Sequence, residues 1–374
     1  MKTDVKKKTT GLFAALALLC AGTASADEAW QQCASLSDDT SRLACYDAWA
    51  SQKKASETPV PIPPNRAETR IVTPLPELAE TGQGIGDGCY SSAYSTLSRW
   101  WELEPGSDCG IFRFRGYRPL SLFVAVSDSV NQQPTSSAKG RTASERDSYK
   151  TTELRGQLSV RTKLATDLLT QGNPEGRDSL WFAYTQQFYW QLFDGGNSRP
   201  FRTTDHEPEL IYIHPFSREL PGGWRLRYTG LGLVHQSNGQ SLPLSRSWNR
   251  LYLMAGAELG ENWLMHARVW KRMSESRGED DNPGIGNLIG RGEFKLAWTA
   301  NDLHSVALTL RHSLRREGNG SARLEWLRTI GSGYSGGKSN LRLHAQLFSG
   351  YGDSLIDFNQ RRTVFSIGLS LIDF

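Results

Sequence analysis

Polar and apolar residues alternate one by one through most of this chain after about residue 108. The alternating runs cover residues 110–126, 152–168, 178–193, 207–217, 223–237, 245–259, 262–275, 287–299, 303–315, 321–331, 339–349 and 361–372. Because successive side chains of a strand point to opposite faces, such alternation predicts strands with one apolar and one polar face. Most runs match the ~9–11 residues of a tilted strand that crosses a bilayer, whereas a soluble β-sandwich has shorter strands. Twelve such runs, an even number, predict an all-β fold, a twelve-stranded antiparallel transmembrane β-barrel of the bacterial outer membrane.

The composition excludes several other classes of protein. Hydrophobic residues make up 38% of the chain and the mean hydropathy is -0.48, which argues against a helical membrane protein. Aromatic residues make up 10%, and disordered chains are poor in aromatics. The net charge of the chain is +4. Four lysines and one aspartate lie in the first 26 residues, so the rest of the chain is nearly neutral. This charge gives no basis for a nucleic-acid partner.

The first 26 residues have the features of a secretory signal peptide. Lysines at 6–8 precede an apolar run over 12–20, and the small residues at 24–26 predict cleavage after residue 26. A retained membrane anchor is the alternative, but the apolar run is too short to span a bilayer comfortably. A lipid anchor at Cys20 is disfavoured because leucines precede it, where a small residue is expected.

Three segments are expected after the signal peptide. Residues 27–54 are predicted to be a helical segment stapled by a disulfide, and residues 109–374 the barrel domain. Residues 55–108 are predicted to be a Pro-rich linker and extension, because six of the 16 prolines lie in 55–80. A periplasmic spacer is the simplest interpretation of this extension. A plug or a partner-docking element has no residue-level support in the sequence.

Four cysteines remain after removal of the signal peptide, and an even number in an exported chain predicts disulfides. Three pairings are possible. The local pairs Cys33–Cys45 and Cys89–Cys109 are favoured because short loops close most easily. A metal site is the alternative, but the cysteines lack the spacing of known metal motifs.

Three residue types with catalytic potential fall on one face of two neighbouring runs. His235 and Ser237 share a face with leucines in run 223–237, and Asn249 shares a face with leucines in run 245–259. The leucine faces must meet lipid in a barrel, and a hairpin centred near residue 242 pairs position 235 with about 249. A histidine can accept the proton of a serine, and an amide oxygen can hold the histidine in the required tautomer. The alternative is a polar collar at the membrane edge.

Several stretches together resemble the outer-membrane phospholipase A family. The matching stretches, in the same order over about residues 110–374, are 184–186, 190–192, 235–239, 245–250, 280–283 and 350–357. The resemblance implies a twelve-stranded barrel and a calcium-dependent lipase that is activated by dimerisation. It implies Ser237 as nucleophile, His235 as base and Asn249 as the orienting group. It also implies that the Gly239 amide forms part of the oxyanion hole, completed by calcium and its waters.

The same resemblance implies the calcium ligands. They are the main-chain carbonyl of Gln240, Ser245, and Ser198 of the other subunit. Gln240 stands where the family has an arginine, which matters little if only the carbonyl binds. Leu242 stands where the family has an aspartate that binds a second calcium in the monomer, although Asp281 is present at that site. We therefore expect poor calcium binding to the monomer.

One polar side chain, Gln186, interrupts an otherwise apolar face. The residues that share its face are Leu180, Phe182, Tyr184, Phe188, Trp190 and Leu192. Facing lipid, an unpaired amide costs several kcal/mol (~4–8 for transfer to hydrocarbon), so a second copy of the chain is expected to supply its partner. The alternative is a position at headgroup level, where water satisfies the amide.

These features predict an enzyme that hydrolyses acyl esters of glycerophospholipids, with lysophospholipids as related substrates. The alternative is a non-enzymatic barrel, namely a small porin or a structural or adhesion protein. A porin needs a wide polar lumen, and inward-pointing large side chains are expected to leave little room. These inward residues are Trp181, Tyr189, Arg246, Trp248 and Arg250.

Overall fold

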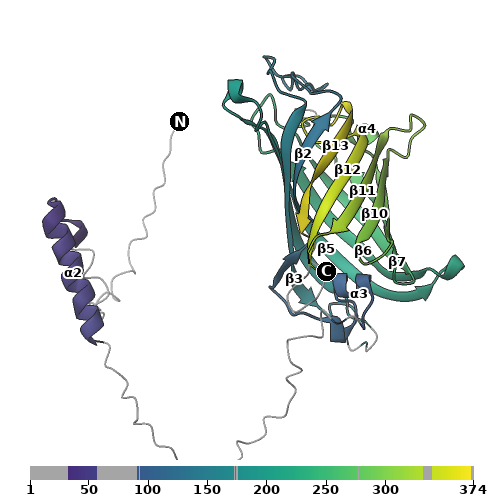
Figure 1. Ribbon diagram of the computed structural model, residues 1–374, viewed down its shortest axis with the longest axis horizontal. Coiled ribbons are helices and arrows are strands. Elements are labelled where there is room, and N and C mark those ends of the chain that lie inside the picture. Colours follow the sequence, from purple (N-terminus) through teal and green to yellow (C-terminus); the bar gives the residue numbers. More distant parts are fainter. Residues whose placement is uncertain are drawn as a thin grey trace, which may run out of the picture. The chain divides into compact units, whose positions relative to one another are not determined.

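The second of two compact units in the chain is a closed β-barrel (Figure 1). The computed structural model describes residues 33–56, 91, 93–171, 173, 176–276, 278–331 and 339–371. The units comprise residues 1–78 and 79–374, and each is described by itself. The predicted signal peptide, residues 1–26, lies outside the described residues and remains a prediction.

Every pair of neighbouring strands in the barrel is antiparallel. The strands are β1 (Phe114–Gly116), β2 (Leu120–Ser127), β3 (Thr152–Thr166), β4 (Ser179–Trp190), β5 (Phe201–Glu219), β6 (Arg225–Ser237), β7 (Ser247–Leu259), β8 (Trp263–Arg272), β9 (Gly292–Thr299), β10 (His304–His312), β11 (Gly320–Thr329), β12 (Leu341–Tyr351) and β13 (Arg361–Leu371). Each strand pairs with its sequence neighbour from β2 onward, and β13 returns to pair with β2. Each of the strands β2–β13 therefore has a neighbour on both sides, as a barrel in lipid requires.

The predicted number of twelve strands is confirmed, because β1 and β2 are two parts of one strand. Both pair with β3, through Gly116↔Val160 and Ser121↔Gln157, and the intervening residues contain Pro119. Proline has no N–H to donate to a strand ladder, so Pro119 accounts for the interruption between β1 and β2.

The largest differences from the predicted strand boundaries are at the starts of β5 and β9. β5 begins at Phe201, whereas the predicted run begins at 207. Residues 202–206 are polar on both faces of the strand, so the alternation of polar and apolar residues does not reveal this part. β9 begins at Gly292 and not at 287, because the short helix α4 (Ile285–Leu288) precedes it.

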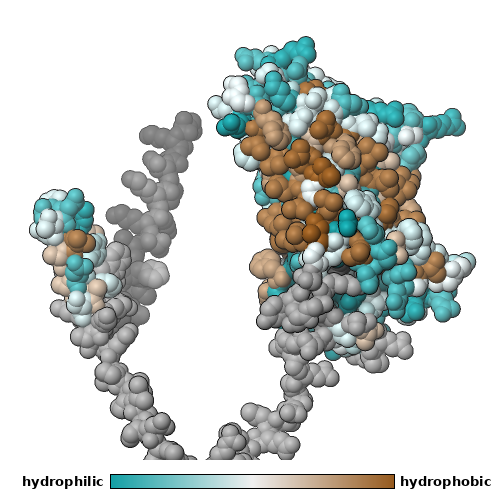
Figure 2. Space-filling view, in the orientation of Figure 1, coloured by the Kyte–Doolittle hydropathy of each residue, from teal (hydrophilic) through white to brown (hydrophobic). Residues whose placement is uncertain are grey.

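The outer surface of the barrel carries a broad apolar band between two polar ends (Figure 2). The predicted phase of the last strand is confirmed: Phe365, Ile367 and Leu369 are exposed, whereas Ser366 and Ser370 are buried. β4 follows its predicted phase in the same way, with Trp181 buried and Phe182 exposed. The exposed leucine, valine and phenylalanine side chains form the surface that meets lipid.

Ion pairs fill much of the barrel interior. Arg202 donates to Glu153 and to Asp357, and Arg155 donates to Asp353 through both terminal nitrogens at 2.7 and 2.8 Å. Charges this deeply buried are stable only when they are paired and hydrogen-bonded. The network thus ties β3 and β5 to the loop between β12 and β13.

The large side chains expected to fill the lumen are buried as predicted, but they do not fill all of it. Trp181, Tyr189, Arg246, Trp248 and Arg250 are at most 8% exposed. A cavity of about 1410 Å³ nevertheless remains inside the barrel, so the expectation of little room was too strict.

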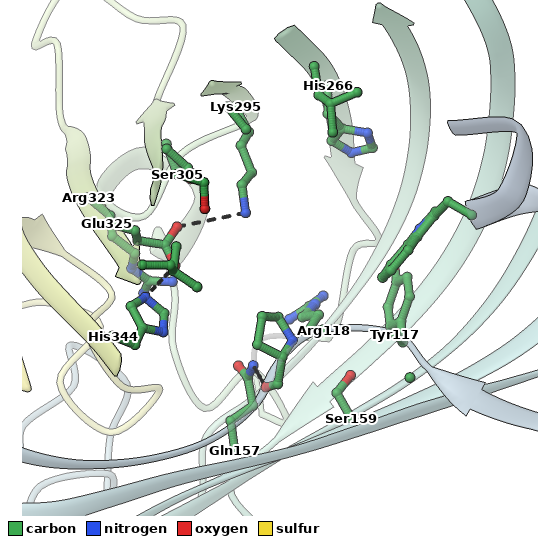
Figure 3. A pocket seen from close by; sticks show the side chains of 18 of the residues that line it. Tyr117, Arg118, Gln157, Ser159, His266, Lys295, Ser305, Arg323, Glu325 and His344 are labelled. Atoms are coloured by element: carbon green, nitrogen blue, oxygen red, sulfur yellow. Dashed lines mark hydrogen bonds and ion pairs between the residues drawn. The ribbon is translucent and has the colours of Figure 1, made fainter. Parts of the chain in front are cut away.

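Charged side chains from the strands β9–β12 line part of this cavity (Figure 3). Lys295 Nζ lies 3.7 Å from Glu325 Oε2, and His344 Nε2 lies 3.4 Å from Glu325 Oε1. Arg118, between β1 and β2, and Gln157 of β3 also line it.

The two ends of the barrel differ in their connections. The longest loops, residues 128–151 and 273–291, lie at the same end as the β6–β7 loop. In outer-membrane barrels the longer loops face the outside and the shorter turns face the periplasm. His235 and Ser237, near the β6–β7 loop, therefore lie toward the outer end.

A short helix, α3 (Thr96–Trp101), packs into the opposite end of the barrel. Trp101 is 2% exposed, and its ring centre lies 5.7 Å from those of both Trp181 and Tyr228. Glu102 ends the helix in a left-handed conformation and pairs with Arg115 and Lys163, each over 2.6 Å. A 3-10 turn, η2 (Pro105–Ser107), follows.

Leu97, Trp101 and Leu103, near the end of the predicted 55–108 extension, pack among buried residues of the barrel. These residues plug the lumen, and the barrel unit starts before the predicted boundary at residue 109. Residues 57–90, which include most of the Pro-rich segment, lie outside the described residues.

The described part of the first unit is a helix held by a disulfide. α2 (Asp39–Ser56) begins after Asp38, whose carboxylate accepts from the Ser41 amide over 2.8 Å, as a helix-capping side chain does. Cys33 and Cys45 form the predicted disulfide. Cys109 in the barrel unit is also disulfide-bonded, but Cys89 lies outside the described residues, so that pairing stays a prediction.

Among the described residues, no helix has both the length and the apolar character to cross a membrane.

The plug predicts a specific effect on stability. Trp101→Ala should lower the free energy of unfolding of the barrel by ~3–5 kcal/mol, because it leaves a cavity among buried rings. The midpoint of the heat-induced shift in electrophoretic mobility measures this change. Leu43→Ala on α2, where the side chain is 64% exposed, is the control and should leave the midpoint unchanged. An unchanged midpoint for Trp101→Ala would show that the plug does not support the barrel.

Candidate active site

His235 and Asn249 form a hydrogen-bonded pair on the outer face of the barrel. They are directly opposite in the β6–β7 ladder, as the predicted hairpin requires. His235 Nδ1 lies 2.8 Å from Asn249 Oδ1. An amide oxygen only accepts, so Nδ1 carries the proton and the other ring nitrogen, Nε2, keeps a free lone pair. His235 is therefore held in the tautomer that a general base needs.

A carboxylate that the sequence did not indicate fixes the orientation of the Asn249 amide. Asn249 Nδ2 donates to Glu275 Oε1 over 3.5 Å, and Arg272 pairs with Glu275 over 3.0 Å. Burial raises the pKa of Glu275, and Asp280 adds to this, although the Arg272 guanidinium opposes the shift. With the amide nitrogen facing this carboxylate, the amide oxygen must face His235.

Ser237 lies on the same outer face as His235, two positions further along β6. It is half-buried, and Ser247 is its partner in the ladder. Within the described part of the chain no hydrogen bond joins Ser237 to His235. The structure thus brings the predicted serine, histidine and amide together but forms only the histidine–amide contact.

Asn238 organises the loop that follows Ser237. Its amide donates to the Leu244 carbonyl over 2.8 Å, and its oxygen accepts from the Arg246 amide over 2.9 Å. Gly239 has a φ of +62°, the left-handed region that favours glycine. The loop therefore holds the Gly239 main chain in a fixed turn two residues after the predicted nucleophile.

A second histidine, His206, lies opposite Ser237 in the β5–β6 ladder. Tyr184 Oη lies 2.7 Å from its Nδ1. The sequence prediction placed Tyr184 on the lipid-facing side without a role, and it missed His206 because residue 206 lies outside the run that was predicted for β5. The only available signal was the alternation of His206 with the acidic residues Asp205 and Glu207.

The predicted calcium ligands Ser245 and Asp281 lie together at the outer end. Ser245 Oγ donates to Asp281 Oδ2, and Arg141 Nε donates to Asp281 Oδ1 over 2.6 Å. The carboxylate is therefore already neutralised by a guanidinium. Arg141, from the loop before β3, is a further residue that the sequence prediction did not include.

The two remaining predicted ligands, Gln240 and Ser198, lie in two different connections between strands. The main-chain carbonyl of Gln240 accepts no hydrogen bond from the residues that the structure describes. Ser198 is exposed in the turn between β4 and β5, with a φ of +56°. Leu242, where the family has an aspartate, is 56% exposed.

These donors fit calcium chemically, because hydroxyl, carbonyl and carboxylate oxygens are the ligands that calcium prefers. No cluster of three or more His, Cys, Asp or Glu side chains that could hold a metal occurs in the described ranges. A calcium site built from this chain alone thus has one carboxylate and few protein ligands.

The fold and this cluster define a class: an outer-membrane β-barrel that carries a serine, a histidine and an amide on its lipid-facing surface. Residues 97–371 match the family model described as Phospholipase A1. A protein of Neisseria meningitidis serogroup B that carries a phospholipase A1 name is 34% identical over 359 residues, which cover 91% of this chain and 90% of that protein.

Two solved structures have the same fold. The outer membrane phospholipase A of Escherichia coli has a TM-score of 0.59 at 31% identity, over 70% of this chain and 94% of that chain. A Salmonella typhi outer membrane phospholipase, solved as a dimer with bound calcium, has a TM-score of 0.59 at 30% identity, over 70% and 93%. The chain belongs to the phospholipase A1 family, and it is an enzyme of the outer membrane.

Proposed function

We propose that this chain hydrolyses acyl ester bonds of outer-membrane glycerophospholipids, with Ser237 as nucleophile, His235 as base and Asn249 as the orienting group. The observation that carries the proposal is the His235–Asn249 hydrogen bond, formed on the lipid-facing surface beside Ser237. A base on this surface can act on a lipid that stays within the membrane.

In the first half of the reaction, Ser237 Oγ attacks the ester carbonyl carbon while His235 Nε2 takes its proton. The carbonyl oxygen becomes an oxyanion, and the Gly239 amide donates to it. The intermediate then collapses as His235 returns the proton to the departing glycerol oxygen. The products of this half are a lysophospholipid and an acyl group on Ser237.

In the second half, water attacks the acyl group and His235 takes the proton from that water. Collapse of the second intermediate releases a fatty acid, and the proton returns to Ser237. Throughout, Asn249 stabilises the protonated ring less strongly than a carboxylate does. The charge of Glu275 behind the amide partly compensates for this difference.

Calcium is proposed to be the cofactor, held by the Gln240 carbonyl, Ser245 and a partner's Ser198. When bound, calcium supplies positive charge next to the developing oxyanion. The dimer with bound calcium seen for the Salmonella typhi protein supports this assignment. The Arg141–Asp281 pair supports weak calcium binding to the monomer, because Asp281, the carboxylate predicted at this site, is already paired with Arg141.

A homodimer is proposed to be the active form, with Gln186 at its interface. Gln186 lies on the outer face of β4, and its amide makes no hydrogen bond to any described residue. The β4–β5 ladder pairs Gln186 with His206, which pairs in turn with Ser237. At ~4.8 Å between strands, a partner docked at Gln186 lies ~10 Å from the nucleophile.

The identity of the nucleophile is tested by labelling. A sulfonyl fluoride should modify Ser237 and abolish phospholipid hydrolysis, and Ser237→Ala should lower the rate by at least ~10³-fold. Asn249→Ala should keep measurable activity, because the amide orients the base and transfers no proton. Hydrolysis is followed by release of fatty acid from mixed micelles. Wild-type activity in Ser237→Ala would sink the proposed function.

Calcium dependence is tested by chelation. Removal of calcium should stop hydrolysis and leave the heat-induced mobility shift unchanged, because strand pairing and not metal satisfies the barrel backbone. Loss of the fold, or undiminished hydrolysis, would contradict the assignment.

Arg141→Ala tests the monomer site separately. It should tighten calcium binding to the monomer by about fivefold, equivalent to ~1 kcal/mol for one nearby charge at a partly exposed site. Isothermal titration measures the change. Arg146→Ala, an exposed arginine of the same loop, is the matched control and should have no effect.

Dimerisation is tested at Gln186. Gln186→Leu should weaken the dimer by ~3-fold to ~18-fold, since polar contacts in membranes contribute ~0.6 kcal/mol on average and up to ~1.7. Crosslinking yield and hydrolysis should fall together. Gln187→Leu is the control, because Gln187 points inward and bonds Gln157 over 2.8 Å. Full activity with a lost dimer would show that the two are not coupled.

A further inference from the structure

A row of polar residues crosses the outer face of three strands beside the proposed nucleophile. The β4–β5 ladder pairs Gln186 with His206, and the β5–β6 ladder pairs His206 with Ser237. His206 is half-buried, between the inward-pointing Asp205 and Glu207. Its ring therefore shares the lipid-facing surface with Ser237.

Tyr184 decides which ring nitrogen of His206 carries the proton. Tyr184 Oη and His206 Nδ1 are 2.7 Å apart, and the two rings are stacked with centres 6.3 Å apart. The tyrosine hydroxyl has no other hydrogen-bond partner among the described residues. If Nδ1 donated to Oη, the hydroxyl hydrogen would lack an acceptor on an apolar surface, which is costly. The hydroxyl therefore donates to Nδ1, and the proton of the ring is on Nε2.

The protonated nitrogen of His206 faces the Gly239 turn. A Cβ placed on Gly239 would lie 3.6 Å from both Nε2 and Cδ2 of His206. The imidazole edge thus borders the space beside the Gly239 main chain, whose amide is the proposed oxyanion donor. An acceptor oxygen near that amide lies next to a second N–H.

We propose that His206 Nε2–H is a second donor of the oxyanion hole, a role that rests on the proposed function. In each tetrahedral intermediate the substrate oxygen accepts from the Gly239 amide and from His206 Nε2. No bond to His206 forms or breaks, and it transfers no proton. Because its Nε2 is protonated, His206 cannot take the proton of Ser237, so the two histidines have opposite tasks.

Three variants test this role. His206→Phe removes the donor and should lower kcat by ~10²–10³-fold with little change in KM, since the bond is made to the developing charge. His206→Gln offers an amide N–H in its place and should recover most of that loss. Tyr184→Phe removes the hydroxyl that holds the tautomer and should have a smaller effect on kcat. His214→Phe, a histidine at an outward position of the same strand, is the control and should act like wild type.

Rates are measured at saturating calcium and are expressed per crosslinked dimer, so that a change in association is not counted as a change in chemistry. The affinity of an alkyl boronic acid, which forms a tetrahedral adduct with an active serine, is measured in parallel and should fall with kcat in His206→Phe.

Unchanged kcat and boronate affinity in His206→Phe would overturn the proposal. So would a His206→Gln variant as slow as His206→Phe, or a loss that disappears when rates are expressed per dimer. If the wild-type chain and Ser237→Ala hydrolyse lipid equally, the proposed function itself fails. That outcome differs from an active wild type that tolerates His206→Phe.

Discussion

Closure of the sheet is the constraint on which the rest of this structure depends. In lipid, every strand must find both neighbours, and the pairing of β13 with β2 completes the ring. Once the ring is closed, each side chain has only two destinations, the lipid or the lumen. Apolar residues take the first and charged residues the second, which is why Arg202, Glu153 and Asp357 are buried together as a paired network. The alternation of polar and apolar residues in the sequence follows from this requirement for a closed sheet in lipid.

The candidate site lies where polar side chains interrupt the apolar outer face of the barrel. The two histidines there differ in what holds their Nδ1 atoms, an amide oxygen at His235 and a tyrosine hydroxyl at His206. The first arrangement leaves Nε2 free to accept a proton, and the second leaves it protonated. In the proposed mechanism, one residue type thus serves as a base and as a hydrogen-bond donor on two neighbouring strands. Neither task requires a charged ring in the resting enzyme.

The sequence predicted the features that depend on local alternation or on a single hairpin. The twelve strands, the phase of β4 and the pairing of His235 with Asn249 belong to this group. Features that depend on contacts between distant segments were not predictable from pattern alone. Trp101 enters the lumen from a segment that reads as a linker, and Glu275 reaches Asn249 from the irregular loop after β8. His206 was missed for a further reason, since polar residues fill both faces at the start of β5.

With Ser237 as the proposed nucleophile, its position on the outside of the barrel determines how the enzyme meets its substrate. A lipid in the same leaflet reaches this surface by diffusion in two dimensions, without leaving the membrane. On the proposed function, the relevant substrate concentration is the number of glycerophospholipids per unit area of the leaflet that this surface faces. Hydrolysis would then be controlled at two points: the number of barrels with a complete site, and the number of phospholipids that enter this leaflet.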